Sequence, residues 1–202
     1  MTVRLIVGVS GASGSIYAVR LLRQLRALPV ETHLVVSPAA QRTLAYETDL
    51  KLADLEALAD RVHPFADIGA SIASGSFRTL GMVVAPCSIK TMSEIACGVT
   101  NSLLTRAADV ILKERRRLVL MVRETPLHAG HLRNLLALAE AGAIIAPPVP
   151  AFYARPETVE DLVDQSVGRV LDLFDLDAPA TRRWRDEGPQ GIPQQRPRRP
   201  ES

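Results

Sequence analysis

The sequence predicts a single-domain α/β fold, a doubly wound parallel sheet of the Rossmann or flavodoxin-like type with helices on both faces. Short apolar runs alternate with longer segments whose apolar residues recur every three or four positions, which is typical of buried parallel strands joined by helices. The 202 residues, 47% of them apolar, are enough to bury one sizeable core. The first apolar run ends in a cluster of small residues, as in folds that bind a ligand beyond the strand ends.

We expect strands where short runs are rich in Val, Ile, Leu, Met or Ala, at residues 5–9, 32–36, 82–85, 118–122 and 143–146. We expect helices where the three-to-four spacing holds, at residues 16–28, 39–48, 52–59, 101–114, 127–141 and 158–174. Residues 1–180 are therefore predicted to form the domain. Residues 181–202 are rich in Arg, Pro and Gln and lack the apolar side chains of a core, so we expect a flexible tail.

The charge distribution argues against a nucleic-acid-binding surface. The formal net charge is +2, but six arginines and three acids lie from residue 182 onward, which leaves 18 basic and 19 acidic residues before them. A nearly neutral domain lacks the concentrated Lys and Arg that nucleic acid requires. Cys87 and Cys97 are too few for a disulfide framework, and we find no signal peptide or long apolar span. A cytoplasmic protein that binds no membrane is expected.

The segment Ser10–Ser15, after the first predicted strand, has the composition of a phosphate-binding loop. Its glycines allow a tight turn with backbone N–H groups near a ligand, and the following helix N-terminus adds partial positive charge. The segment is neither the Gly-x-Gly-x-x-Gly fingerprint nor a Walker A loop, and the hydroxyls of Ser10, Ser13 and Ser15 replace the Walker lysine. An ordinary strand-to-helix turn with a serine N-cap is the alternative.

Polar residues also follow the other predicted strands. They are Ser37 and Pro38 after the second strand, residues 86–91 after the third, 123–126 after the fourth and 147–153 after the fifth. Because the carboxyl ends of parallel strands lie at one edge of the sheet, we expect these hydroxyls, cations and one acid to converge there.

Seven short motifs resemble those of the UbiX-like flavin prenyltransferases, the partner enzymes of UbiD-type decarboxylases. They lie in order between about Leu5 and Phe174 and are Ser10-Gly-Ala-Ser-Gly14, Ala73-Ser-Gly-Ser-Phe77, Pro86-Cys-Ser-Ile-Lys-Thr91, Arg106-Ala-Ala-Asp109, Leu112-Lys-Glu-Arg115, Arg123-Glu-Thr-Pro126 and Phe152-Tyr153. The resemblance implies metal-independent transfer of a dimethylallyl group from dimethylallyl monophosphate to N5 and then C6 of reduced FMN. It further implies that FMN is a substrate, that prenylated FMN passes to a UbiD-type decarboxylase, and that the protein is a homo-oligomer, a dodecamer built from trimers.

The resemblance assigns the flavin site to the strand ends. The residues expected to contact FMN are Gly11, Ala12, Ser13, Ser37, Ser88, Ile89, Lys90, Thr91 and Arg123. Arg123 suits flavin or phosphate oxygens because its planar guanidinium donates two parallel hydrogen bonds, which a lysine cannot.

A second set is assigned by the resemblance to the prenyl donor: Arg106, Lys113, Arg123, Glu124, Tyr153 and Arg169, with Arg106 reaching in from a neighbouring subunit. Cations and proton donors are needed there because a phosphate leaves readily only when its developing charge is neutralised. Ser13, Glu124 and Lys113 are expected to be catalytic. Ser13 and Glu124 are candidates for acid–base roles, and the sequence leaves open which residue does which.

Ordinary structural roles are the alternatives for several of these residues. The segment Lys113–Arg117 by itself is typical of a solvated helix end, where cations are favoured by the helix dipole. Arg169 could simply extend from an apolar helix to the surface, and Tyr153 could fill a gap in the core.

Three other residues attract notice without a motif to support a site. Cys87 is expected to be a small buried residue, because no motif places a histidine near it. His128 and His131 could form half of a metal site, but no further ligands complete it, so no metal is expected. Ile68 stands where some family members carry a tryptophan, so cation–π stabilisation from that position is absent.

Two other functions compete with prenyl transfer. An FMN-dependent cysteine decarboxylase-like flavoprotein would share the fold, but that group carries a Pro-x-Met-Asn box where this chain has residues 123–126, and its catalytic histidine finds no counterpart. A non-catalytic flavin-binding subunit of a decarboxylase complex would not need Glu124 beside Arg123 behind a buried strand.

Overall fold

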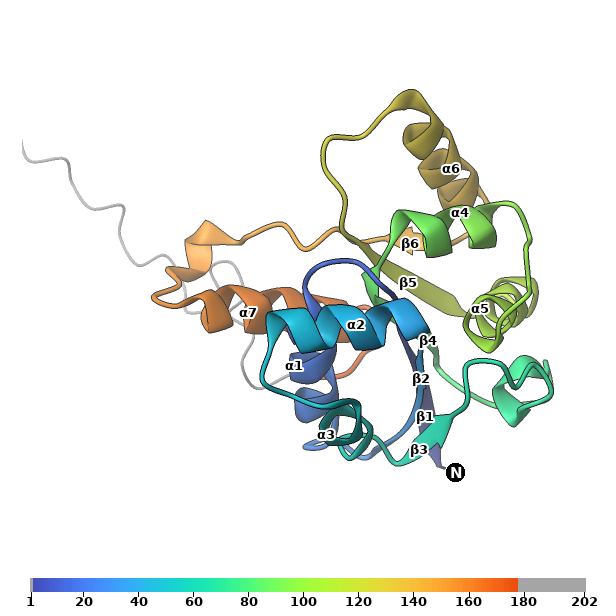
Figure 1. The fold of residues 1–202 in the computed structure, drawn as a ribbon, viewed down its shortest axis with the longest axis horizontal. Helices are drawn as coiled ribbons and strands as arrows, with labels where there is room; N and C mark the ends of the chain where they lie inside the picture. Colours follow the sequence, from blue (N-terminus) through green and yellow to red (C-terminus); the bar gives the residue numbers. More distant parts are fainter. Residues whose placement is uncertain (1, 178–202) are drawn as a thin grey trace, which may run out of the picture.

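The computed structural model describes residues 2–177, which contain a six-stranded, all-parallel sheet (Figure 1). The strand order is β3-β2-β1-β4-β5-β6, and the strands are β1 (Val3–Val9), β2 (Val30–Val36), β3 (Arg61–His63), β4 (Gly81–Cys87), β5 (Arg117–Val122) and β6 (Ile144–Ile145). The order reverses between β1 and β4, and ligands of doubly wound folds bind at such a switch point, beyond the carboxyl ends of the strands. The predicted tail and the last predicted domain residues, 178–202, lie outside the described residues.

Helices cover both faces of the sheet, which confirms the predicted fold class. One face carries α1 (Ser15–Leu25), α2 (Pro38–Glu47), α3 (Leu52–Glu56) and α7 (Val159–Asp172), and the other carries α4 (Ile89–Ala96), α5 (Leu103–Lys113) and α6 (Ala129–Glu140). The short helices η1 (Ser71–Ala73) and η2 (Phe152–Ala154) lie in connecting loops. Successive strand residues enter opposite cores, since Leu5 and Val7 pack with the first helix layer and Ile6 with the second. Within the described residues, no helix combines the length and apolarity needed to cross a bilayer.

The elements differ from the sequence expectations in three places. β3 was not predicted, because three residues at a sheet edge are too few to show an alternation. α4 was not predicted as a helix, because its eight residues complete little more than two turns. The expected strand at 143–146 shortens to two residues because Pro147 and Pro148, which have no N–H group to donate, follow it.

A chain of polar side chains crosses the β2–β3 edge of the sheet. Glu31 Oε1 lies 2.9 Å from His33 Nε2, and His33 Nδ1 lies 2.9 Å from His63 Nε2. The two imidazoles stack, with ring centroids 5.2 Å apart, and the edge of Phe77 meets His33. Burial lowers the pKa of His33 although Glu31 opposes the change, and burial together with the charge of His33 lowers the pKa of His63. Both histidines are therefore neutral at neutral pH.

We expect this pair to make the fold sensitive to acid. In the unfolded chain both histidines regain a pKa near 6.5, so below that pH the unfolded state binds more protons than the folded state. The contribution to stability is complete above about pH 6.5 and decreases as the pH falls towards the lowered pKa values of the folded state. Urea unfolding at about pH 7.5 and about pH 5.5 measures this loss, which should be smaller in His63→Gln.

The matched control for this experiment is Arg42→Gln, which replaces an exposed cation on α2 whose charge does not change between these two pH values. This variant should lose as much stability between the two pH values as the unmodified protein. An equal loss in His63→Gln and in the unmodified protein would contradict the assignment.

Candidate active site

The carboxyl ends of β1, β4 and β5 are tied together by hydrogen bonds. The hydroxyl of Ser10, 1% exposed, donates to the Pro86 carbonyl at 2.9 Å and accepts from the Ser88 N–H at 2.7 Å. The Arg123 N–H donates to the Cys87 carbonyl at 3.1 Å. Ser10 therefore holds the strand ends in place.

The loop after β1 lies against the start of α2. A Cβ at Gly11 would come within 2.4 Å of the Ala39 Cβ, so only glycine fits without moving a helix. Ser37 follows β2, and its N–H donates to the Val9 carbonyl. Its hydroxyl caps α2 by accepting from the Ala40 N–H at 3.1 Å. The predicted flavin residues Gly11, Ala12, Ser13 and Ser37 thus lie on neighbouring loops at one sheet edge.

The first turn of α4 supplies the next predicted group. Ser88 caps this helix by accepting from the Thr91 N–H at 3.3 Å, and the two hydroxyl oxygens are 3.2 Å apart. Lys90 is exposed and forms an ion pair with Glu94 one turn later, at 2.6 Å. The N-terminus of α4, which includes Ile89, and the hydroxyls of Ser88 and Thr91 therefore lie at the carboxyl ends of the strands. The charge of Lys90 is instead directed along the helix.

Arg123 and Glu124 meet the β1 loop in a pocket of roughly 330 Å³. Its lining residues are Ser13, Val122, Arg123, Glu124, Thr125, Pro147 and Pro148. Arg123 donates from Nε to the Ser13 carbonyl, and its guanidinium carbon lies 5.4 Å from the Tyr17 ring centroid. The Glu124 carboxylate is exposed and accepts from the N–H of Thr125 at 3.0 Å. Ser13 and Glu124, two of the three predicted catalytic residues, thus share a pocket with the predicted binding residue Arg123, and Lys113 does not line it.

Glu47, the last residue of α2, is a candidate site residue that the sequence reasoning missed. Its carboxylate accepts from Gly14 N–H at 2.9 and 3.0 Å and from Ser15 N–H at 2.8 Å, at the start of α1. Burial would raise its pKa, but these amides together with the hydroxyls of Ser13 and Ser15 lower it overall, so the group is ionised at neutral pH. The sequence offered one signal for Glu47: it is an acid at the end of a predicted helix. The helix dipole disfavours a negative charge there, so another group is expected to stabilise it.

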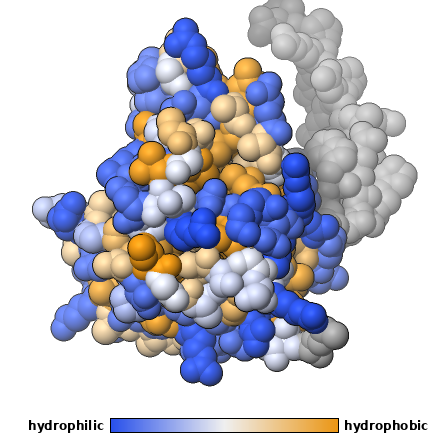
Figure 2. Space-filling model, turned by 90° about the vertical axis from the view of Figure 1, so that its right-hand side faces the viewer, coloured by the Kyte–Doolittle hydropathy of each residue, from blue (hydrophilic) through white to orange (hydrophobic). Residues whose placement is uncertain are grey.

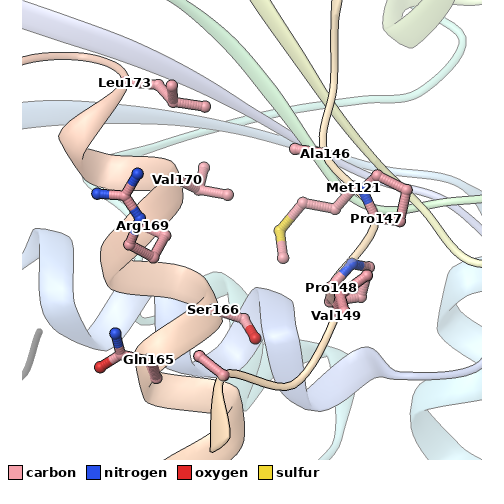
Figure 3. Close-up of a pocket in the computed structure, with 11 residues that line it drawn as sticks. Met121, Ala146, Pro147, Pro148, Val149, Gln165, Ser166, Arg169, Val170 and Leu173 are labelled. Carbon is pink, nitrogen blue, oxygen red and sulfur yellow. The ribbon is translucent and has the colours of Figure 1, made fainter. Parts of the chain in front are cut away.

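A second pocket, of roughly 220 Å³, adjoins the first and shares Pro147 and Pro148 with it. Figure 3 shows Met121 between α7 and the segment 147–149, with Ser166 facing it from α7. Arg169 lines this pocket, but its guanidinium lies along α7 and pairs with Asp172 at 2.5 Å. Tyr153 reaches the same helix through its hydroxyl, 3.4 Å from the Gln165 side-chain nitrogen. Arg169 and Gln165, the partner of Tyr153, thus line the second pocket and not the first.

Arg106 and Lys113 do not join the other predicted residues within one chain. Both lie on α5, on the opposite side of the sheet from Arg169 on α7 (Figure 1). Lys113 precedes the start of β5 whereas Arg123 follows its end, a separation of roughly 20 Å for six residues of strand. Arg106 pairs with Asp109 at 2.6 Å, and neither it nor Lys113 lines the Glu124 pocket.

The remaining candidate residues have structural roles. Cys87 is fully buried and burial raises the pKa of its thiol, so it stays protonated and unsuited to nucleophilic attack. His128 is the N-cap of α6, with Nδ1 accepting from Gly130 N–H at 3.0 Å. Among residues 2–177, no three His, Cys, Asp or Glu side chains are grouped so as to hold a metal ion.

Comparison with known proteins finds flavoproteins, in agreement with the resemblance seen in the sequence motifs. The Flavoprotein family model matches residues 1–171. The flavin prenyltransferase UbiX of Thauera aromatica is 59% identical over 181 residues, which covers 90% of this chain and 93% of the relative.

Two solved structures share the fold at 53% identity. AnUbiX (PadA1), in complex with FMN and dimethylallyl pyrophosphate, superposes with a TM-score of 0.90 and covers 91% of this chain and 98% of that one. A dodecameric FMN-dependent UbiX-like decarboxylase from Escherichia coli O157:H7 superposes with a TM-score of 0.88 and covers 90% and 98%.

The two loop serines should respond differently to loss of the hydroxyl. Ser10→Ala leaves the Ser88 N–H without its buried acceptor, so we expect a loss of about 1–3 kcal/mol in the free energy of unfolding. Ser13→Ala, the matched control, removes an exposed hydroxyl and should leave stability within about 0.5 kcal/mol. Urea unfolding of both variants measures the difference. Equal stability of the two would show that Ser10 does not tie the strand ends together.

Proposed function

The chain belongs to the UbiX-like flavin prenyltransferase family, and we propose that it transfers the dimethylallyl group of dimethylallyl monophosphate to N5 and C6 of reduced FMN. The observation that carries this proposal is the convergence of Ser13, Arg123 and Glu124 on one pocket at the carboxyl edge of the sheet. In the transfer, the bond between the dimethylallyl carbon and a phosphate oxygen breaks as the bond to N5 forms, and phosphate leaves. The alkene then forms the bond to C6. The hydrogens of N5 and C6 are lost as protons, of which one adds to the alkene and the other goes to phosphate.

The loops at this edge fit a flavin mononucleotide. Gly11 allows the loop after β1 to pack directly against the start of α2. The helix N-termini at Ser37 and Ser88 offer backbone N–H groups and hydroxyls to a phosphate. We infer that FMN is held by the nine predicted residues, with Arg123 at the ring or phosphate oxygens. Reduced FMN supplies the electron-rich N5 and C6 atoms, and the protein supplies orientation and charge.

We infer that the phosphate of the donor lies between Arg123, Glu124, Tyr153 and Arg169. Arg123 is held by the carbonyl of Ser13, which lines the pocket, and can exchange this acceptor for phosphate. Arg169 is paired with Asp172 along α7 and lines only the adjoining pocket, so it has to release Asp172 and turn to reach the same phosphate. The adjoining pocket with Met121 and Val170 provides apolar surface suited to an isoprenyl chain. Two fixed cations on a departing phosphate stabilise the charge that develops there.

We assign the proton-transfer groups to Ser13, Glu124 and Glu47. Glu47 is ionised because the Gly14 and Ser15 amides hold its carboxylate, and because these bonds also lower its pKa it accepts a proton only from a group that becomes strongly acidic during the reaction. The Ser13 hydroxyl bonds to this carboxylate and lines the pocket of Glu124, a position from which it can relay a proton between the two. Glu124, at the other side of the pocket, is then the candidate proton donor to the leaving phosphate.

We propose that Lys113 and Arg106 act in the active site of a neighbouring subunit of a homododecamer, as their positions on α5 exclude them from their own chain's pocket. Support comes from the dodecameric relative and from exposed apolar side chains on α6, Leu132 and Leu136. Figure 2 shows apolar residues gathered among polar ones on the side of the molecule that carries α4, α5 and α6. Such a surface is suited to burial against further copies.

The prenylated FMN is proposed to leave the enzyme for a UbiD-type decarboxylase. The alternative functions considered from the sequence, cysteine decarboxylation and non-catalytic flavin binding, gain no support from the site. The residues after β5 are Arg123-Glu-Thr-Pro126 and not the Pro-x-Met-Asn box of the cysteine decarboxylases. Glu124 and Arg123 line the pocket at this position, and an acid beside a cation suits a departing phosphate.

We expect the protein, with reduced FMN and dimethylallyl monophosphate but no added metal, to convert FMN to a product heavier by one prenyl group. Mass spectrometry of the released flavin measures this, and the product should activate a UbiD-type apo-decarboxylase. A parallel reaction with dimethylallyl pyrophosphate establishes the preferred donor. Unchanged flavin mass with both donors would refute the function.

The same assay tests Glu124. Glu124→Gln should bind FMN as the unmodified protein does but lose at least about 100-fold in turnover, because it removes the proposed proton donor. Glu140→Gln, an exposed acid at the end of α6, is the matched control and should be fully active. Full activity of Glu124→Gln would remove this residue from the acid–base role.

Sharing of the site between subunits can be tested by mixing inactive variants. Co-expressed Glu124→Gln and Lys113→Met chains should regain about a quarter of the activity, because an intact site takes each functional residue from a different, randomly chosen subunit. Each variant alone is the control and should be nearly inactive. Activity of the mixture no greater than that of the single variants would place Lys113 outside the neighbour's site.

A further inference from the structure

We propose that Arg116 is a positioning residue for prenyl transfer: it holds the loop Ser74–Phe77 against the end of α5 and so fixes where Lys113 is presented to the neighbouring subunit. This inference rests on the proposed function and adds a residue to it. Arg116 itself touches neither the flavin pocket nor its lining.

The guanidinium of Arg116 joins two segments far apart in the sequence. Nη1 donates to the carbonyl of Phe77 at 2.5 Å and Nη2 donates to the carbonyl of Gly75 at 2.8 Å. Its side chain is only 21% exposed, whereas Lys113, three residues earlier, is 47% exposed. A lysine could not make both bonds with the same fixed geometry, since only the guanidinium offers two donors in a rigid plane.

Gly75 shows how closely the loop approaches the lysine. A Cβ at Gly75 would lie 2.3 Å from Glu114 Oε1 and 2.9 Å from Lys113 Nζ. Lys113 Nζ in turn bonds to Glu114 Oε1 at 2.5 Å. The ammonium group and its carboxylate partner therefore rest directly on the loop backbone, so a displacement of the loop displaces the ammonium.

The rest of the loop is anchored on its far side. The ring of Phe77 meets His33 edge-on, with centroids 4.8 Å apart, and lies 5.4 Å from the Arg4 guanidinium carbon. The hydroxyl oxygens of Ser74 and Ser76 are 2.8 Å apart at the exposed tip. Arg116 thus connects the loop Ser74–Phe77, which packs against His33 of β2, with the exposed end of α5. This connection holds the flexible side chain of Lys113 in one place.

The kinetic test compares Arg116→Met with Arg117→Met. Arg117 is the matched control, because it is the next residue but its charge pairs with Asp175 instead of the loop. For Arg116→Met we expect a drop of about 10- to 100-fold in kcat/KM for dimethylallyl monophosphate, as expected for a displaced catalytic group, with FMN affinity unchanged. Arg117→Met should leave both quantities unchanged, and Arg116→Lys should restore part of the loss.

A second variant covers the case in which Arg116→Met fails to fold. Gly75→Ala keeps both Arg116 bonds but places a methyl group where Glu114 and Lys113 now lie, so it should reproduce the loss in kcat/KM without a loss of FMN binding. Thermal unfolding is measured for every variant. A Gly75→Ala enzyme with unmodified kinetics would overturn the proposal.

Subunit mixing distinguishes positioning from general destabilisation. Arg116→Met co-expressed with Glu124→Gln should regain activity, whereas Arg116→Met with Lys113→Met should not, because both variants damage the same half of the shared site. Regained activity in the second mixture, or unmodified kinetics of Arg116→Met alone, would refute the role of Arg116. Inactivity of the unmodified protein would instead refute the proposed function, so the two failures are distinguishable.

Discussion

The site depends on how the carboxyl ends of three parallel strands are held relative to one another. A buried hydroxyl, that of Ser10, bonds both to the carbonyl of Pro86 and to the N–H of Ser88, so the end of β1 cannot move without the end of β4. The Arg123 N–H extends the same connection to β5 through Cys87. These hydrogen bonds pair main-chain groups that would otherwise be buried without a partner. The loops that carry the candidate site residues therefore begin at strand ends whose relative positions are fixed.

A carboxylate and a guanidinium are both hydrogen-bonded to the loop that follows β1. The start of α1 presents free N–H groups, and Glu47 satisfies two of them while Arg123 satisfies the Ser13 carbonyl next to them. A helix N-terminus stabilises an anion, which accounts for an ionised carboxylate at a ligand site. Ser13 thus lies between a held anion and a held cation, a setting in which a hydroxyl can pass a proton.

The separation of Lys113 from Arg123 follows from topology. A helix that precedes a parallel strand ends at the opposite edge of the sheet from the residues that follow that strand. Lys113 and Arg123 flank β5 in this way, so one chain cannot bring them together, and a closed assembly can. Arg116, which donates to the carbonyls of Gly75 and Phe77, lies three residues after Lys113 at this opposite end of the sheet.

The sequence alone determined the doubly wound fold, since short continuous apolar runs and segments with a three-to-four period are local signals. It also predicted Ser13, Arg123 and Glu124 at one end of the sheet, because the carboxyl ends of parallel strands all lie there. It did not reveal α4 or β3, whose few turns or residues carry too little periodicity. Only the tertiary structure showed that Ser10 is structural, that Glu47 reaches the loop from α2, and that Arg116 holds Gly75. These contacts join residues separated by 32 to 78 positions, and no local pattern encodes the angle at which two helices and a loop meet.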